Sequence, residues 1–403
     1  MKKFRFKAFL LLCLSFSLYA NENTLEIEKL KAQVELLSKK VELRSEDTVL
    51  SVGGRIELQS ISASPDGSFY AGSIPLKNSS KAEYNQFTMS ARESRLWIKT
   101  RTPSEHGPIR ALVEMDFLGV AGTEVYSNSH GPRMRHAYVE AFGFTFGQTN
   151  STFNSYVTLD TITYAMNNTL VRQPLVRYTI DDNALSYDIA FEQPESTLLD
   201  PNGTSIIPKD DKVPDMVTRV RYFSSLTEGS IAFLARYITQ NDVKLSDGNS
   251  VNSSSSALGW GVNLSIKMKT NALDDIRFDV QYGDGMGRYF AYNAYTAGSI
   301  NNEGEIKLQT SYGAHIAYRH WWSKKLRSTL ALSYAGSKNN LEEINLVALK
   351  KINRDAYASQ ANLLWTPISN LLVGIEHSRA IRHVENEDIG ELDMLTLIVR
   401  YDF

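Results

Sequence analysis

Cysteine, long apolar runs and an excess of positive charge are scarce or missing in this sequence of 403 residues. Its single cysteine, Cys13, lies in the N-terminal segment that we interpret as a secretion signal, so we expect neither disulfides nor a thiolate metal site in the mature chain. The 43 lysines and arginines are balanced by 45 aspartates and glutamates, which argues against a nucleic-acid partner. After residue 20 no apolar run approaches the length of about 18 residues that a spanning helix requires. A membrane β-barrel stays possible, because its strands alternate apolar and polar residues.

The first 20 residues have the order of a secretory signal. Four basic residues precede the apolar stretch 8–18, and Ala20 precedes a polar segment. We therefore expect a signal peptide at residues 1–20. An uncleaved anchor is the alternative, although the apolar stretch is shorter than the roughly 20 residues that span a bilayer. Removal of the signal takes away four basic and no acidic residues, so the mature chain is net acidic.

Residues 21–47 carry a different pattern. Apolar side chains recur there at alternating spacings of three and four, with glutamate and lysine between them: Ile27, Leu30, Val34, Leu37 and Val41. This heptad pattern predicts a short α-helical coiled coil. An amphipathic helix packed on its own domain is the alternative. The pattern is too short to set the number of chains in the coil.

From residue 48 onward, segments of about ten residues have an apolar side chain at every second position. In one of them Ile276, Phe278 and Val280 alternate with charged or amide residues. The sequence predicts an all-β fold, a transmembrane antiparallel barrel over residues 48–403. Its sixteen strands are expected near residues 52–60, 91–101, 109–118, 133–141, 143–149, 174–180, 184–192, 216–224, 229–239, 257–269, 275–284, 309–321, 327–337, 355–365, 370–380 and 392–403.

Short and long connections alternate between these expected strands. The long ones are 61–90, 119–132, 150–173, 193–215, 240–256, 285–308, 338–354 and 381–391. Short periplasmic turns and long external loops around an even number of strands are the plan of a bacterial outer-membrane barrel. A soluble β-sandwich, the alternative, has no reason to keep this asymmetry. The 20 Tyr, 17 Phe and 5 Trp, with Phe403 ending the last strand, also suit a barrel whose aromatic residues gather at the membrane interfaces.

Arginine is concentrated on the expected strands two to six. A sixteen-stranded barrel is wide enough to hold water, and basic side chains in a narrow part of its lumen would concentrate anions. Each lumen charge taken alone is also compatible with simple solvation. The candidate residues are Arg95, Arg110, Glu114, Asp116, Arg133, Arg135, Arg172 and Arg177.

The sequence offers little for catalysis or for a cofactor. Its seven histidines are scattered, without the spacing of metal ligands. His377 and Ser378 are adjacent on an expected strand, so their side chains point to opposite faces and cannot form a nucleophile and its base. We expect no enzyme activity, no cofactor and no metal.

Several short runs between residues 94 and 178 together resemble a known family. They are Ser94-Arg95-Leu96, Thr102-Pro103 with Gly107-Pro108-Ile109-Arg110, Glu114-Met115-Asp116-Phe117, Arg133-Met134-Arg135-His136-Ala137-Tyr138, Gly147-Gln148-Thr149-Asn150-Ser151-Thr152-Phe153 and Arg172-Gln173-Pro174-Leu175-Val176-Arg177-Tyr178. In these runs, and in the order of signal, coil and barrel, the sequence resembles the DcaP-like porins of Gram-negative outer membranes. Asn150 departs from the aromatic residue expected in that family.

The resemblance implies a trimer of sixteen-stranded barrels whose N-terminal coils associate in the periplasm and whose third long loop folds inward. It also implies passage of small negatively charged solutes, dicarboxylates included. The six candidate arginines would then form the basic wall of the constriction, and Glu114 and Asp116 would face them. Expected partners are further copies of the chain, outer-membrane lipid and lipopolysaccharide, and small anionic solutes.

Two classes of function stay open at this point. The first is a passive, anion-favouring diffusion channel in the outer membrane, with a general non-selective porin as its close variant because the mature chain as a whole is acidic. The second is a plugged barrel that presents its long loops for adhesion or binding.

Overall fold

The computed structural model describes residues 43–45, 47–120, 122–123, 125, 127–155, 157–208 and 211–403. The predicted signal peptide and the first 22 residues of the predicted coil, 21–42, lie outside the described residues. In the described part the helices are short 3₁₀ turns, namely η1 (Ser80–Glu83), η2 (Gly287–Tyr289), η3 (Ala291–Asn293) and η4 (Leu346–Lys351). None of these helices is long and apolar enough to cross a membrane.

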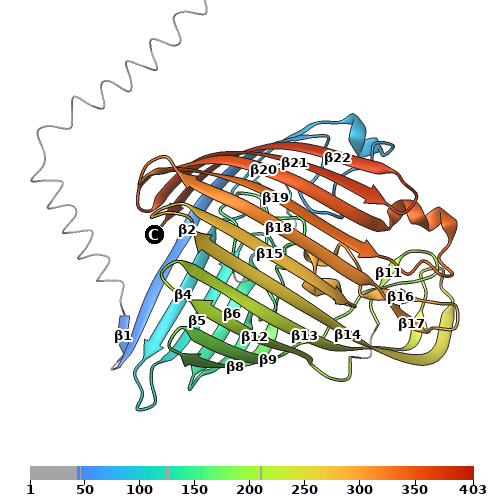
Figure 1. Ribbon diagram of the computed structural model, residues 1–403, viewed down its shortest axis with the longest axis horizontal. Coiled ribbons are helices and arrows are strands. Elements are labelled where there is room, and N and C mark those ends of the chain that lie inside the picture. The colour runs from blue at the N-terminus through green and yellow to red at the C-terminus, as the bar shows by residue number, and fades with distance from the viewer. Residues whose placement is uncertain are drawn as a thin grey trace, which may run out of the picture.

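Sixteen antiparallel strands close a barrel, and each pairs with its neighbours along the chain (Figure 1). The ring closes where Arg55 of the first strand pairs with Asp402 of the last. All sixteen predicted strands are present, and the all-β prediction is confirmed. The strands are β2 (Thr48–Ser64), β4 (Arg95–Thr102), β5 (Ile109–Asp116), β6 (Arg133–Ala141), β7 (Phe144–Asn150), β8 (Arg172–Asp182), β9 (Leu185–Glu192), β12 (Asp215–Phe223), β13 (Thr227–Lys244), β14 (Ser250–Lys269), β15 (Asp275–Asp284), β18 (Thr310–Trp321), β19 (Leu326–Lys338), β20 (Asn353–Ile368), β21 (Leu371–Val384) and β22 (Ile389–Asp402).

Two short strands, β1 (Leu43–Ser45) and β3 (Gln86–Ser90), pair with β2 in addition to its ring neighbours. β1 lies within the last residues of the segment predicted as coil, so the sheet already begins there. β3 and β4 pair with successive stretches of β2 and form one strand that is interrupted at residues 91–94. The predicted strand 91–101 is therefore interrupted at its first residues, and the pairing of β3 extends into the predicted loop 61–90.

Along each strand of the barrel, side chains point alternately to the outer face and to the inner face, as β22 illustrates. Leu395, Leu397 and Val399 are each at least 43% exposed, whereas Thr396 and Ile398 are 1% and 5% exposed. Outward apolar side chains are what a lipid-facing band requires. Exposed aromatic residues occur near both ends of the strands. At the end of the barrel that carries the short connections, called here the turn end, they are Phe144, Phe146, Tyr178, Trp322, Trp365, Tyr401 and Phe403.

Two of the predicted long connections are short. β13 and β14 continue to Lys244 and from Ser250, and β21 and β22 leave only residues 385–388 between them. The predicted loops 240–256 and 381–391 are therefore wrong in length. In the first hairpin, Val243 belongs to a buried apolar cluster and Val251 packs against that cluster. Because these contacts hold the two strands together, the mostly polar residues around them still pair as strand.

The third loop (151–171) and the sixth loop (285–309) lie inside the barrel. Thr163 of the third loop hydrogen-bonds to Glu376 of β21, and Met166 to Ser333 of β19, far around the ring from β7 and β8. The inward third loop implied by the resemblance is confirmed by these contacts. In the sixth loop the Tyr295 hydroxyl donates to the carbonyl of Ala335 on β19.

Small side chains on the inner wall make room for these loops. The main buried cluster joins large loop residues such as Phe153, Tyr289 and Phe290 to inward alanines of the strands: Ala190, Ala232, Ala335, Ala356, Ala358 and Ala380. A small sheet of β10 (Leu198–Leu199), β11 (Ser205–Ile206), β16 (Gly298–Ile300) and β17 (Ile306–Leu308) joins the fourth and sixth loops. Figure 1 shows this sheet at the end of the barrel opposite the C-terminus, called here the loop end.

Candidate solute-binding site in the lumen

Strand register brings four charged side chains into one row on the inner wall. Arg55 of β2 lies opposite Arg95 of β4, Arg95 opposite Asp116 of β5, and Asp116 opposite Arg133 of β6. The next row toward the turn end contains Glu114, which pairs with His136. Because side chains on one face of a sheet are spaced closely across strands, these rows form a continuous charged surface.

A β-bulge in β6 adds a further arginine to this surface. The pairing shifts between Glu114–His136 and Met115–Met134, which leaves Arg135 without a partner across the strand pair. Two successive side chains then face the lumen, since Arg135 binds acidic residues there and the His136 Nδ1 lies 2.9 Å from the Thr149 hydroxyl. Bulges re-aim side chains in this way.

Glu114 and Asp116 are held by arginines. Arg133 makes a two-pronged contact with Asp116, with Nε–Oδ1 at 3.0 Å and Nη2–Oδ2 at 2.7 Å. Arg135 reaches both acids, with Nε–Oε1 of Glu114 at 2.6 Å and Nη1–Oδ2 of Asp116 at 2.9 Å. Arg95 lies 3.8 Å from Glu114. Charge-assisted pairs of this geometry fix both partners, so the acids serve to orient the arginines.

Arg172, at the start of β8, differs from Arg95, Arg133 and Arg135. Its charge interacts with those of Arg135, Arg133 and Arg95. Within the described chain no acidic side chain forms an ion pair with it, and its buried Nε has no hydrogen-bond partner. The Nε of Arg95 is likewise unpartnered. These unpartnered N–H donors lie beside other positively charged side chains. This part of the wall is therefore the best prepared to bind an anion.

Three tyrosines from different loops lie beside the arginines. Tyr292 of the sixth loop packs against Tyr70 of the first loop, with ring centroids 4.8 Å apart, and against Tyr164 of the third loop at 5.7 Å. Tyr164 interacts electrostatically with Arg95 and Arg172. Burial raises the pKa of Tyr70 to about 12 and the pKa of Tyr292 well above its usual value. The phenols of Tyr70 and Tyr292 therefore stay neutral and add no negative charge opposite the arginines.

The turn that carries Tyr292 is strained. Ala291, Tyr292 and Asn293 have φ of 47°, 56° and 59°, a left-handed conformation that costs about 1–2 kcal/mol per L-residue. Neighbouring contacts hold it, since Asn168 donates to the Tyr292 hydroxyl at 3.0 Å and Thr169 donates to the carbonyl of Tyr289. Strain of this kind persists only where the surroundings enforce it.

The third loop is fastened to the opposite wall by two charged contacts. Glu376, which is fully buried, accepts the backbone N–H of Ile162 at 2.6 Å and of Thr163 at 2.7 Å. Asp160 forms ion pairs with Arg327 at 2.6 Å and with Arg319 at 3.4 Å. Burial opposes ionisation of Asp160, but the arginines outweigh it and hold the pKa of this carboxyl below its usual range.

Six of the eight sequence-predicted residues gather in this cluster, namely Arg95, Glu114, Asp116, Arg133, Arg135 and Arg172. The other two lie elsewhere on the wall. Arg110 stands 4.0 Å from Glu140 near the turn end, and Arg177 lies beside Tyr138 and Arg219.

Sequence reasoning missed the three tyrosines, because loop residues show no periodicity that reveals their position. Among the described residues, no group of three or more His, Cys, Asp or Glu side chains could hold a metal ion.

Comparison with known proteins gives this barrel a family. The matching family model, described as DcaP outer membrane protein, covers residues 60–403. The outer membrane channel DcaP of Acinetobacter baumannii aligns with a TM-score of 0.74 at 19% identity, over 90% of this chain and 99% of that one. The anion-selective porin from Comamonas acidovorans aligns with a TM-score of 0.57 at 9% identity, over 88% and 100% of the two chains.

OmpT of Vibrio cholerae gives a TM-score of 0.56 at 9% identity, over 90% of this chain and 100% of that one. At these identities the likeness to solved structures concerns the fold, which is that of a porin barrel. No curated protein matches the chain. Since the family model spans most of the sequence, the chain belongs to the DcaP outer membrane protein family.

Proposed function

We propose that this outer-membrane protein is a water-filled channel for passive diffusion of small hydrophilic anions such as dicarboxylates. The observation that carries the proposal is the pair of arginines, Arg95 and Arg172, whose buried Nε atoms have no hydrogen-bond partner in the described chain. A solute carboxylate supplies the missing acceptors. The inward third and sixth loops narrow the lumen at this point, where low-dielectric walls strengthen the field of the arginines.

In this proposal the eight residues predicted from the sequence act in two groups. Arg95, Glu114, Asp116, Arg133, Arg135 and Arg172 form the constriction. Arg110 and Arg177 lie on the path between the constriction and the turn end. In the porin orientation the turn end faces the periplasm. The channel needs no cofactor and performs no chemical reaction.

The assembly is part of the same proposal. The family resemblance supports a homotrimer, with residues 21–47 associating as a periplasmic coiled coil after removal of the signal peptide 1–20. Outer-membrane lipid surrounds the apolar outer face, and lipopolysaccharide contacts the loop end.

Liposome swelling tests the channel against its alternatives. We expect liposomes that contain the protein to swell faster in succinate than in a neutral solute of equal size. Equal rates for both solutes would indicate a general porin. A barrel that admits neither would support the adhesion alternative, which the buried apolar cluster of loop residues inside the lumen favours.

Tyr292 is expected to limit the width of the pore. Replacing it with alanine removes the ring that contacts Tyr70 and Tyr164, so single-channel conductance should rise. Tyr292→Phe keeps the ring and loses only the hydrogen bond from Asn168, so it should conduct like the wild type. Tyr222→Ala, at an exposed position on β12, serves as a control. Equal conductance of Tyr292→Ala and the wild type would place the narrowest point elsewhere.

Asp160 makes the third loop sensitive to acid. Because its folded pKa is depressed, its ion pairs stabilise the loop fully above the unfolded pKa of about 3.9 and are lost as pH falls through the folded value. We therefore expect conductance to stay constant from neutral pH to about pH 4 and to become larger and noisier below it. Asp160→Asn should show at neutral pH the larger and noisier conductance expected of the wild type in acid, whereas Asp182→Asn, at the exposed end of β8, should not. A quiet, unchanged Asp160→Asn channel would contradict this role.

A further inference from the structure

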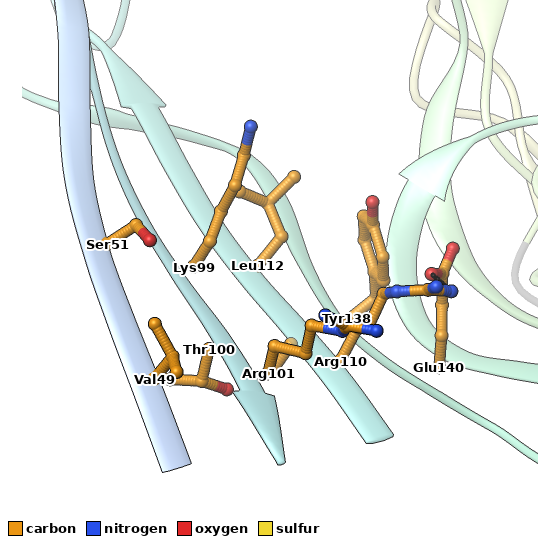
Figure 2. A pocket seen from close by; sticks show the side chains of 10 residues that line it. Val49, Ser51, Lys99, Thr100, Arg101, Arg110, Leu112, Tyr138 and Glu140 are labelled. Carbon is orange, nitrogen blue, oxygen red and sulfur yellow. Dashed lines mark ion pairs between the residues drawn. The ribbon is translucent and has the colours of Figure 1, made fainter. Parts of the chain in front are cut away.

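A second group of basic side chains lies apart from the constriction, near the turn end of the barrel. They surround a cavity of about 260 Å3 between β2, β4, β5 and β6 (Figure 2). Strand register places its lining residues in two successive rows. One row is Val49, Arg101, Arg110 and Glu140, and the other is Ser51, Lys99, Leu112 and Tyr138.

The charges in this cavity are not balanced. Arg101 and Arg110 lie directly opposite each other on neighbouring strands, an arrangement of like charges that destabilises a sheet. Figure 2 shows both side chains extending in the same direction, toward Tyr138 and Glu140. The single acid, Glu140, stands at 4.0 Å from Arg110, at the limit of an ion pair. Within the described chain neither Arg101 nor Lys99 has an acidic partner.

Lys99 is nevertheless held in place. Its Nζ lies 4.0 Å from the centre of the Trp97 ring, a cation–π contact that fixes the ammonium group without using its hydrogen-bond donors. The Tyr138 hydroxyl adds a neutral donor in the same row. The cavity thus has oriented donors and excess positive charge.

We propose that this cavity is a second binding site for a small oxyanion, a carboxylate or phosphate group, at the periplasmic mouth of the pore. Paired guanidinium groups match the geometry of such anions, and a bound oxyanion would bridge Arg101 and Arg110. The cavity is also large enough, since one water takes up about 30 Å3. This inference rests on the proposed channel function, for which it supplies a release site.

The mouth site is separate from the constriction. Lys99 and Arg95 are four residues apart on β4, which corresponds to about 13 Å along a strand. An anion that leaves the constriction therefore meets fixed positive charge again before it reaches the periplasm, with Arg177 also on this side of the cluster. Two weak sites in sequence keep an anion in the pore yet let it leave.

Calorimetry on the purified full-length protein can isolate the mouth site. Succinate and inorganic phosphate are titrated separately into Arg172→Gln, which weakens the constriction, and into the triple variant Arg172→Gln/Lys99→Gln/Arg101→Gln. We expect the triple variant to bind the anions about tenfold more weakly or not at all, since a hydrogen bond to a charged group contributes that much. Binding of both anions identifies a general oxyanion site, and binding of succinate alone identifies a carboxylate site.

Equal affinity of Arg172→Gln with and without the two mouth substitutions would overturn the site, and so would the absence of binding in Arg172→Gln. Arg101→Lys, which keeps the charge, should bind better than Arg101→Gln, and it guards against a loss of folding in the triple variant. The two proposals fail separately. A barrel that conducts nothing but loses calorimetric binding in the triple variant contradicts only the channel, whereas a conducting barrel with unchanged binding contradicts only the mouth site.

Discussion

Replacing Arg172 with glutamine is expected to remove most of the anion preference of the channel. Arg172 has no acidic partner in the described chain, so its charge is not cancelled locally. Its field adds to those of Arg133 and Arg135, which are largely neutralised by Asp116 and Glu114. At low salt the ratio of anion to cation permeability should fall by a factor on the order of 10, because lumen charge sets the local concentration of counter-ions.

The choice of Arg172 avoids a structural complication. Removing Arg135 would leave Glu114 and Asp116 short of a partner, and an unpaired buried carboxylate is costly. Loss of Arg172 leaves no acid unpaired. Arg172→Lys should retain part of the preference, and Arg379→Gln, on the outer face of β21, is the matched control. A reversal potential in Arg172→Gln equal to that of the wild type would contradict the role of this arginine.

Replacing Glu376 with alanine is expected to free the third loop and to increase conductance strongly. The carboxylate accepts the N–H groups of Ile162 and Thr163, the Thr163 hydroxyl and the Asn362 amide. Each buried donor left without a partner costs about 1–3 kcal/mol, so the variant weakens the attachment of the loop at several atoms at once. The loop should then leave the lumen for part of the time. In single-channel recordings we expect larger and noisier conductance steps.

A graded control accompanies this variant. Ser378→Ala removes one contact to the Thr163 hydroxyl at 3.0 Å and one to the Glu376 carboxylate at 3.2 Å, but it leaves the backbone N–H groups of the loop bound, so its effect should be small. Correct folding of both variants can be checked by their mobility on gels before and after heating. If Glu376→Ala is folded and its steps equal those of the wild type, the third loop does not narrow the pore.

The barrel was predictable from the sequence because lipid and water impose a period of two on every strand. The outward residues of β22, from Leu395 to Val399, carry this pattern without interruption. Strand ends were less predictable. Polar residues such as Asn241 and Ser254 still pair in the hairpin of β13 and β14, since beyond the membrane the ladder no longer needs apolar side chains.

The candidate site was predictable in part. Arginines on strands two to six pointed to a basic wall, but the sequence could not reveal which row each occupies. Arg95 and Arg110 were both predicted to line the constriction. Strand register instead places Arg110 opposite Arg101, in the row of side chains at the mouth of the pore. The bulge at Arg135 and the positions of Tyr70, Tyr164 and Tyr292 depend on tertiary contacts that no local pattern encodes.

The reversal potential of the wild-type protein in a planar bilayer under a salt gradient tests the central claim most directly. We expect conductance steps grouped in threes, as a trimer would give, with a reversal potential that favours the anion. The preference should weaken as ionic strength rises, because salt screens the lumen charges. A folded barrel that conducts with no anion preference, or one that does not conduct, would contradict the account.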